Sequence, residues 1–268
     1  MFIGKIDKLP SYAFSNKSNL KSIIIPDSVT YIGAYAFQNC SKLTSIIIPN
    51  NVVEIMKYAF IGCWGITSIV WNAKNCADFS RSDYAPFYDI KSQITSFTFG
   101  SEVEHIPAYL CYYMENLTSV TIPDSVTTIG GSAFIGCSGL TSIIIHNSVT
   151  SIGKQTFYDC SNLTSVTIPN SVTSIGNMAF YNVPNIVYSG TATGSPWGAR
   201  SVNGYVEGYL VYESEAKTQL LACSHAVTGE IIIPNSVTNI NNRAFSHCSN
   251  LTSVIIPNSV VCIDKFTF

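Results

Sequence analysis

Apolar and polar residues alternate in a pattern that returns every 23 residues along most of the chain. The unit has the form F-x-x-C-x-x-L-x-x-I-x-I-P-x-x-V-x-x-I-x-x-x-A. The phenylalanines that open the units fall into three groups, with a step of 23 inside each group: Phe14, Phe37 and Phe60; Phe134, Phe157 and Phe180; Phe245 and Phe268. A fixed period of this length is the sequence signature of a solenoid, in which each unit stacks on its neighbours.

The middle of each unit predicts a short strand. In one copy Val166 and Ile168 are two residues apart, so both side chains point to one side of a strand, and Thr167 points to the other side. Pro169 has no N–H to give to a strand ladder and therefore ends the strand. The apolar side of the strand is expected to face the core.

The rest of the unit predicts turns. Val172 and Ile175 are three residues apart, which favours a turn or a short 3₁₀ segment on the side opposite the strand. A single unit cannot bury its own apolar edges, but stacked units can. We therefore expect a curved solenoid of about ten units, with a parallel sheet on the concave side and turns or 3₁₀ segments on the convex side, folded as one domain over residues 1–268.

Two segments depart from the unit. Residues 71–93 contain a polar insertion that makes the step to Phe87 four residues longer than the standard one, and in the next unit Leu110 stands where a phenylalanine is expected. Residues 184–228 begin as a loop and continue as two predicted strands, 205–212 and 219–223, which we interpret as a hairpin that replaces one repeat. Both ends of the chain fall inside a unit, which indicates a fragment of a longer protein.

Composition excludes some classes of function. Only 11% of residues are charged, against an average of about 25%, and the formal net charge is −2. Long-range attraction to nucleic acid is not expected from such a chain. The apolar runs are too short to cross a membrane, and the first residues do not have the pattern of a signal peptide.

The cysteines and histidines do not form a recognisable catalytic or metal-binding motif. Five of the nine cysteines share one repeat position: Cys40, Cys63, Cys137, Cys160 and Cys248. They could be disulfide partners or metal ligands, but one thiol per stacked unit favours a ladder of small buried side chains. The C-x₂-C spacing of zinc sites is absent from the sequence, as are nucleophile-elbow and phosphate-loop motifs. We expect neither a metal, nor a cofactor, nor enzyme activity.

The repeat resembles the BspA-like leucine-rich repeats. The shared unit is A-F-x-x-C-x-x-L-T-S-[VI]-x-I-P-x-S-V-T-x-I-G, found from Ala133 to Gly153 and again from Ala36 onward. The resemblance covers nearly the whole chain and implies a leucine-rich-repeat solenoid. It also implies a secreted or cell-surface protein of bacteria or mucosal protozoa that adheres to extracellular-matrix proteins or to neighbouring cells. It carries no catalytic residues over to this sequence.

The outward positions of the predicted strands are the leading candidate for a binding surface. Stacking would align them as ladders of hydroxyl groups on the concave side. The candidates are Thr44, Ser45, Thr118, Ser119, Thr121, Thr141, Ser142, Thr164, Ser165 and Thr167. The same residues are also common in strands for structural reasons alone, because β-branched and hydroxyl side chains favour strand pairing.

Two alternatives stay open on sequence grounds. Aromatic residues in the irregular segments could form a patch that binds glycans, because tyrosine and tryptophan are frequent in binding sites. That patch would consist of Trp71, Tyr88, Trp197, Tyr205 and Tyr209. The chain could also be a spacer within a larger surface protein.

Overall fold

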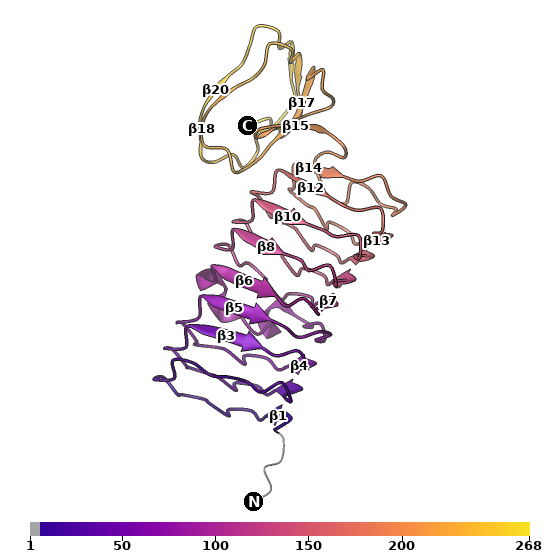
Figure 1. Cartoon of the computed structure of the whole chain (residues 1–268). Helices are drawn as coiled ribbons and strands as arrows, with labels where there is room; N and C mark the ends of the chain where they lie inside the picture. The colour runs from indigo at the N-terminus through magenta and orange to yellow at the C-terminus, as the bar shows by residue number, and fades with distance from the viewer. Residues whose placement is uncertain (1–5) are drawn as a thin grey trace, which may run out of the picture.

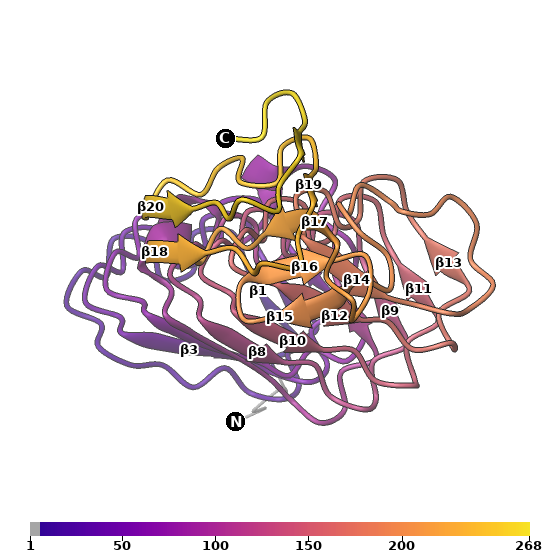
Figure 2. The same cartoon turned by 90° about the horizontal axis from the view of Figure 1, so that it is seen from above.

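The protein folds into a solenoid of about 11 turns of roughly 23 residues, in which successive turns of the chain are stacked on one another (Figure 1). This computed structural model describes residues 6–268. Two series of short parallel strands run along different sides of the stack, as the view from above shows (Figure 2). The predicted solenoid architecture is confirmed, with about one turn more than the sequence suggested.

The longer strands form the first side of the main stack, which we call the strand face. They are β3 (Ser45–Ile48), β5 (Ser68–Trp71), β6 (Ser96–Phe99), β8 (Ser119–Thr121), β10 (Ser142–Ile144), β12 (Ser165–Thr167) and β14 (Asn185–Val187). Equivalent residues of successive turns pair in parallel, for example Ser142 with Ser119. Hydrogen bonding divides the face into three sheets, β3–β5–β6, β8–β10 and β12–β14.

A second series of strands corrects the expected turns and 3₁₀ segments. The pair of apolar residues after the proline leads into two-residue strands that pair in parallel from turn to turn. These strands are β1 (Lys8–Leu9), β2 (Tyr31–Ile32), β4 (Glu54–Ile55), β7 (His105–Ile106), β9 (Thr128–Ile129), β11 (Ser151–Ile152) and β13 (Ser174–Ile175). Stacking provides a partner for each backbone segment, so extended backbone is favoured over an isolated 3₁₀ turn.

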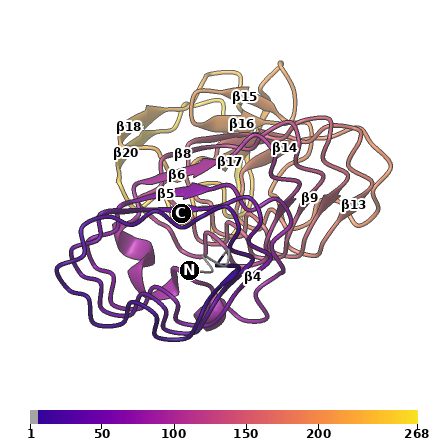
Figure 3. The same cartoon turned by 60° about the horizontal axis from the view of Figure 1, so that its bottom comes forward.

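Helical structure is confined to the insertion. Within residues 6–268 the two 3₁₀ helices are η1 (Ser82–Tyr84) and η2 (Tyr88–Gln93), whose coiled ribbons stand apart from β5 and β6 in Figure 3. The insertion keeps the stack intact because Phe87 still lies on Phe60, with ring centroids 5.2 Å apart. The four extra residues are therefore absorbed on the outside of the turn.

Stacked phenylalanine rings run through the core. The centroids of Phe134 and Phe157 are 5.5 Å apart with nearly parallel planes, and those of Phe157 and Phe180 are also 5.5 Å apart. Each of these rings is fully buried. Aromatic pairs at such distances add about 0.5–1.5 kcal/mol beyond the burial of their area.

The turn before Phe134 has a cysteine in place of the ring. The amide of Cys111 donates to the carbonyl of Ala133, just as the amide of Phe37 donates to Ala59 in another turn. Cys111, not Leu110, therefore occupies the phenylalanine position, and the sequence prediction for Leu110 was wrong by one residue. The space is filled by Phe99, whose ring meets the edge of Phe134 at 6.4 Å.

In most turns two backbone positions adopt the left-handed conformation, two residues before and two residues after the phenylalanine position. Around Phe134 they are Ser132 (φ 56°) and Gly136 (φ 67°). The amides of residues 132, 134 and 136 then donate to carbonyls of the next turn at 2.8, 2.9 and 2.7 Å. This conformation costs a non-glycine residue about 1–2 kcal/mol, and the hydrogen bonds between turns offset that cost.

The C-terminal region begins with an antiparallel meander. Strand β15 (Tyr205–Glu207) pairs with β16 (Leu210–Tyr212), which pairs with β17 (Gln219–Cys223). The segment expected to be one strand over 205–212 is thus two strands, because Gly208 takes a positive φ of 58° and turns the chain back. The strand β17 then pairs in parallel with β19 (Asn239–Ile240), and β19 pairs with β21 (Cys262–Ile263).

The buried side chains form two clusters. One extends from Leu9 to Ala199, and the other from Leu210 to Cys248. Beside the second cluster, β18 (Gly229–Ile232) pairs in parallel with β20 (Leu251–Ile255) and resumes the strand pattern. The meander therefore separates a long stack from a short C-terminal one.

Phe157→Ala tests the contribution of the ring stack. Removing a buried ring that contacts rings on both sides should lower the free energy of unfolding by about 3–5 kcal/mol, measured by urea denaturation. Phe268→Ala is the matched control, because Phe268 holds the same repeat position but is exposed and stacks only on Phe245. A similar loss in both variants would contradict the ring stack as a main source of stability.

Candidate functional site

The strand face brings the candidate hydroxyl residues together. Eight of the ten are exposed on it: Thr44, Ser45, Thr118, Ser119, Thr121, Thr141, Ser142 and Thr167. The other two, Thr164 and Ser165, are partly buried near the end of the main stack. All ten lie on or directly beside strands whose alternate residues point into the core.

Most of these hydroxyl groups are available to a partner. Within residues 6–268, only Ser165 among the ten uses its side chain in a hydrogen bond, accepting from the Nδ2 of Asn185 at 3.1 Å. A protein partner can therefore bind to the hydroxyls without first breaking bonds inside the solenoid. Charged side chains are absent from the positions of these strands between Ser45 and Thr167.

A further column of outward-facing residues holds the position between the two buried positions of each strand. It mixes exposed isoleucine and valine with threonine. Ile47 is 53% exposed and Ile144 is 64% exposed, and Val187 continues the column on β14. Exposed apolar side chains beside unbonded hydroxyls are typical of a protein-binding surface. The apolar side chains provide area that a partner can bury, and the hydroxyls can orient that partner.

A groove interrupts the strand face where the hydrogen bonding between β6 and β8 is broken. Its volume is about 380 Å³. The residues that line it include the threonines Thr98 and Thr121 and the mostly buried Phe97 and Phe99. The four-residue insertion precedes this break in the chain, and no period in the sequence indicated the groove.

The structure corrects the aromatic alternative. Trp71 is fully buried on β5, and Trp197 is buried with its Nε1 donating to the carbonyl of Thr193 at 2.9 Å. Tyr88 belongs to η2, Tyr205 to β15, and Tyr209 lies exposed in the turn between β15 and β16. The two tryptophans fill the core at the irregular turns, so these five residues do not form one patch.

Trp64 is an exposed aromatic residue that the sequence analysis overlooked. Its side chain is 56% exposed, and it directly follows the ladder cysteine Cys63. Ser41, Ser138, Ser161 and Ser249 hold the same repeat position in other turns. The replacement of serine by tryptophan at a solvent-facing repeat position was the signal available in the sequence.

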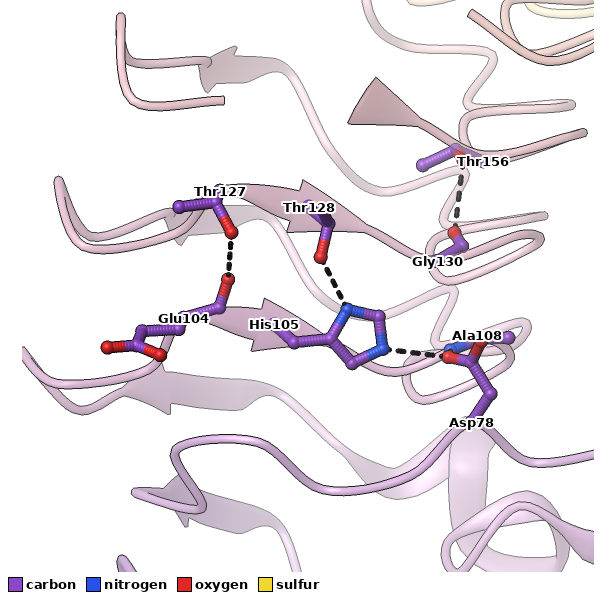
Figure 4. Close-up of polar contacts among 8 residues, drawn as sticks. All are labelled: Asp78, Glu104, His105, Ala108, Thr127, Thr128, Gly130 and Thr156. Carbon is purple, nitrogen blue, oxygen red and sulfur yellow. Dashed lines mark hydrogen bonds and ion pairs between the residues drawn. The ribbon is translucent and has the colours of Figure 1, made fainter. Parts of the chain in front are cut away.

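A polar network joins the insertion to the following turns (Figure 4). Asp78 Oδ1 lies 2.8 Å from Nε2 of His105, and the Nδ1 of His105 lies 2.7 Å from the hydroxyl of Thr128. The same carboxylate oxygen accepts the backbone N–H of Ala108 at 2.7 Å. The hydrogen bond with His105 is the main reason that the pKa of Asp78 lies below its usual range.

The order hydroxyl, imidazole, carboxylate also occurs in nucleophilic triads. Here the pocket beside Asp78, of about 230 Å³, is lined by neither His105 nor Thr128. Neighbouring hydroxyls make the same kind of link between turns, such as Thr127 Oγ1 to the carbonyl of Glu104 at 3.1 Å. The geometry is that of a connection between turns, which fixes the insertion to the stack.

The ladder cysteines are buried, as predicted, and their thiols have a structural use. The Sγ of Cys63 donates to the carbonyl of Phe37 at 3.0 Å, and the Sγ of Cys160 donates to that of Phe134 at 3.1 Å. Burial raises the pKa of Cys63 to about 12, which suppresses the reactive thiolate. All nine cysteines are free thiols, and only Cys262 is exposed.

Groups suited to a metal ion are not found in the described part of the chain, where no three His, Cys, Asp or Glu side chains gather. Residues 6–268 also contain no helix long and apolar enough to cross a membrane.

The turn length, the strand series and the buried ladders define a leucine-rich-repeat solenoid. The sequence pattern described as BspA type leucine rich repeat region matches residues 7–85, 80–190 and 222–268, with six copies. The protein belongs to the BspA-type leucine-rich-repeat family. Repeats of this type are typically non-catalytic, and the family supports a protein-interaction module.

Solved structures of similar proteins come from several bacteria. A leucine-rich repeat protein from Bacteroides ovatus is 22% identical, with a TM-score of 0.45 over 96% of this chain and 78% of the other. A leucine rich cell surface protein from Faecalibacterium prausnitzii is 27% identical, with a TM-score of 0.39 over 100% of this chain and 64% of the other. No curated protein sequence matches the chain. The family assignment rests on the repeat itself.

Asp78→Asn should weaken the network in a pH-dependent way. Because the folded pKa is depressed, the stabilisation from the carboxylate is complete above the unfolded value of about 3.9 and is lost as pH falls through the folded value. The variant should be less stable than the parent by about 0.2–1 kcal/mol near neutral pH, and the difference should shrink below about pH 4. Denaturant titrations from pH 3 to 7 measure this, with Asp27→Asn, an exposed turn residue, as control. A difference that persists unchanged at pH 3 would exclude the proposed role of the charge.

Alkylation of thiols in the native protein should modify Cys262 and leave the buried cysteines intact until the protein unfolds. Mass spectrometry of the native and the denatured protein counts the modified residues. Cys262→Ser is the control and should show no rapid reaction in the native state. Rapid modification of a ladder cysteine would mean that the stack opens far more often than its burial implies.

Proposed function

We propose that this protein is a non-catalytic binding module, surface-exposed or secreted, whose strand face binds an extracellular-matrix or cell-surface protein of a host or neighbouring cell. The observation that carries the proposal is the face itself, on which uncharged hydroxyl groups, most of them unbonded within residues 6–268, lie beside exposed apolar side chains. An extracellular location is part of the same proposal, because the partners implied by the family resemblance lie outside the cell.

The chemistry of the strand face favours a protein as the partner. Binding removes water from Ile47 and Ile144, which contributes roughly 25 cal/mol for each Å² of apolar surface covered. The hydroxyls can bond to backbone or amide groups of the partner and so compensate for their own loss of water. With a net charge of −2, affinity has to come from local contacts and should depend weakly on salt.

The groove between β6 and β8 is the proposed centre of the interface. Its walls come from Phe97 and Phe99 together with the threonines Thr98 and Thr121. An apolar side chain of the partner can enter between them while its backbone bonds to the rim. Residues that fill a pocket in this way usually supply most of the binding energy of an interface.

Thr121→Arg tests this proposal. A charge at the rim of the groove would have to lose water without a partner, so the affinity for the bound protein should fall at least about tenfold, or by about 1.4 kcal/mol. Binding is measured on immobilised extracellular-matrix proteins, including fibronectin and fibrinogen, at physiological salt. Thr173→Arg is the matched control, since Thr173 is equally exposed but lies outside the strand face, beside β13.

The parent protein and Thr173→Arg should bind one member of the panel saturably, and thermal melting should show that both variants fold. Equal binding by Thr121→Arg and Thr173→Arg would remove the strand face as the site. If the parent protein binds no matrix protein of the panel, extracellular-matrix proteins are excluded as its partners.

A further inference from the structure

A polar cleft lies between the main stack and the short C-terminal stack, away from the strand face. Figure 1 shows the C-terminal turns, around β18 and β20, standing beyond the end of the main stack at β14. The cleft has a volume of about 570 Å³. Pockets for small ligands commonly have volumes of about 300–1,000 Å³, so the cleft has room for a ligand of a few sugar rings.

The wall on the main stack comes from the corner of each turn that precedes the strand. Asp159 and Asn182 hold the same repeat position, and Asn182 Nδ2 donates to Asp159 Oδ1 at 2.6 Å. This bond orients the carboxylate and leaves its second oxygen without a partner among residues 6–268. Glu115 and Asn162 line the same wall with a second carboxylate and a second amide.

The opposite wall contains a buried histidine. His225 is only 8% exposed, and its Nε2 lies 3.4 Å from Nη2 of Arg200. Because a guanidinium group can only donate, this contact makes Nε2 the acceptor and places the proton on Nδ1. Burial, with help from Arg200, lowers the pKa of His225 to about 4, so the ring is neutral near pH 7.

His225 lines the cleft, and its Nδ1 carries the proton that is left for a further partner. Within residues 6–268 it makes no hydrogen bond other than the contact with Arg200. His247 and Asn250, from the next turn, extend this wall with further polar groups. A ligand in the cleft can therefore bond to this wall without breaking a hydrogen bond of the His225 N–H.

We propose that this cleft binds a neutral oligosaccharide. Sugar hydroxyls both donate and accept, and the cleft offers both partners: the carboxylates of Glu115 and Asp159 accept, while the amide of Asn162 and the N–H of His225 donate. The partly exposed ring of Tyr113 adds carbon surface for the C–H groups of a sugar ring.

The charges of the cleft set the specificity. Neither Glu115 nor Asp159 forms an ion pair with any residue of 6–268. Two unneutralised carboxylates repel acidic ligands, so sialylated or sulfated sugars and phosphates should be excluded. The site lies apart from the strand face, so it is independent of the protein-binding proposal.

Ser161→Trp is the variant that fills the cleft. Ser161 lines it, and Trp64 holds the same repeat position in another turn with its ring in solvent, so the backbone there accepts a tryptophan. Ser41→Trp is the matched control, at the same repeat position but outside the cleft. Asp159→Asn is a second test that keeps the space and the fold, because Asn39 and Asn182 already occupy this repeat position.

The experiment is an array of neutral plant and microbial oligosaccharides with sialylated and sulfated ones, followed by calorimetry on the neutral oligosaccharide that binds best. The parent protein and Ser41→Trp should bind neutral oligosaccharides and leave the acidic ones unbound. Ser161→Trp should abolish binding, and Asp159→Asn should weaken it at least about tenfold, since it removes a charged acceptor. Thr121→Arg should leave it unchanged.

Three results would overturn the proposal. One is a parent protein that binds no neutral oligosaccharide on the array. Another is a folded Ser161→Trp that binds as well as Ser41→Trp. If Ser161→Trp fails to fold, unchanged binding by Asp159→Asn would be decisive in the same way.

Discussion

Each turn of this protein depends on equivalent positions in the turns beside it. The Phe ring lies on the ring of the next turn, and the cysteine thiol reaches back to the carbonyl at the preceding Phe position. In most turns, backbone N–H groups at and around the phenylalanine donate to the turn ahead, as they do around Phe134 and Phe157. A core side chain can therefore be exchanged only for one that keeps the stacking, which explains why the apolar positions return every 23 residues along most of the chain.

The same constraint decides where function can reside. The strand must present alternate residues to the core, so its remaining residues face solvent and form aligned columns. Those columns are not required for stacking, and most of their hydroxyl groups have no partner among residues 6–268. A large, regular and uncharged surface is thus a direct consequence of the fold, and its use for binding needs no change in the core.

Departures from the period have physical consequences of their own. The insertion before Phe87 keeps the ring stack but is followed by a break in the sheet between β6 and β8, where the groove lies. The meander of β15, β16 and β17 likewise interrupts the core before the C-terminal stack. Both proposed sites lie at such interruptions.

The period of the sequence predicted the solenoid, the strands and the buried cysteine ladder, because each depends on local spacing. The phenylalanine position of the turn before Phe134 was predicted one residue too early, at Leu110 instead of Cys111. Turns were expected where two-residue strands form, because hydrogen bonding between turns outweighs the local preference of the backbone. Trp71 and Trp197 were candidates for an alternative surface patch, but irregular turns leave space in the core that large rings fill. The cleft at His225 combines residues of two stacks, so no local pattern in the sequence could indicate it.

Amide hydrogen exchange of the free protein, resolved residue by residue, tests the stacking most directly. Slow exchange is expected at the phenylalanine position and two residues before and after it in the turns of Phe14, Phe134 and Phe157, and it should be maintained at Tyr109, Cys111 and Tyr113. Exchange there as fast as in exposed loops would contradict this expectation, because the turns would then lack the hydrogen bonds between equivalent positions on which the fold and both binding surfaces depend.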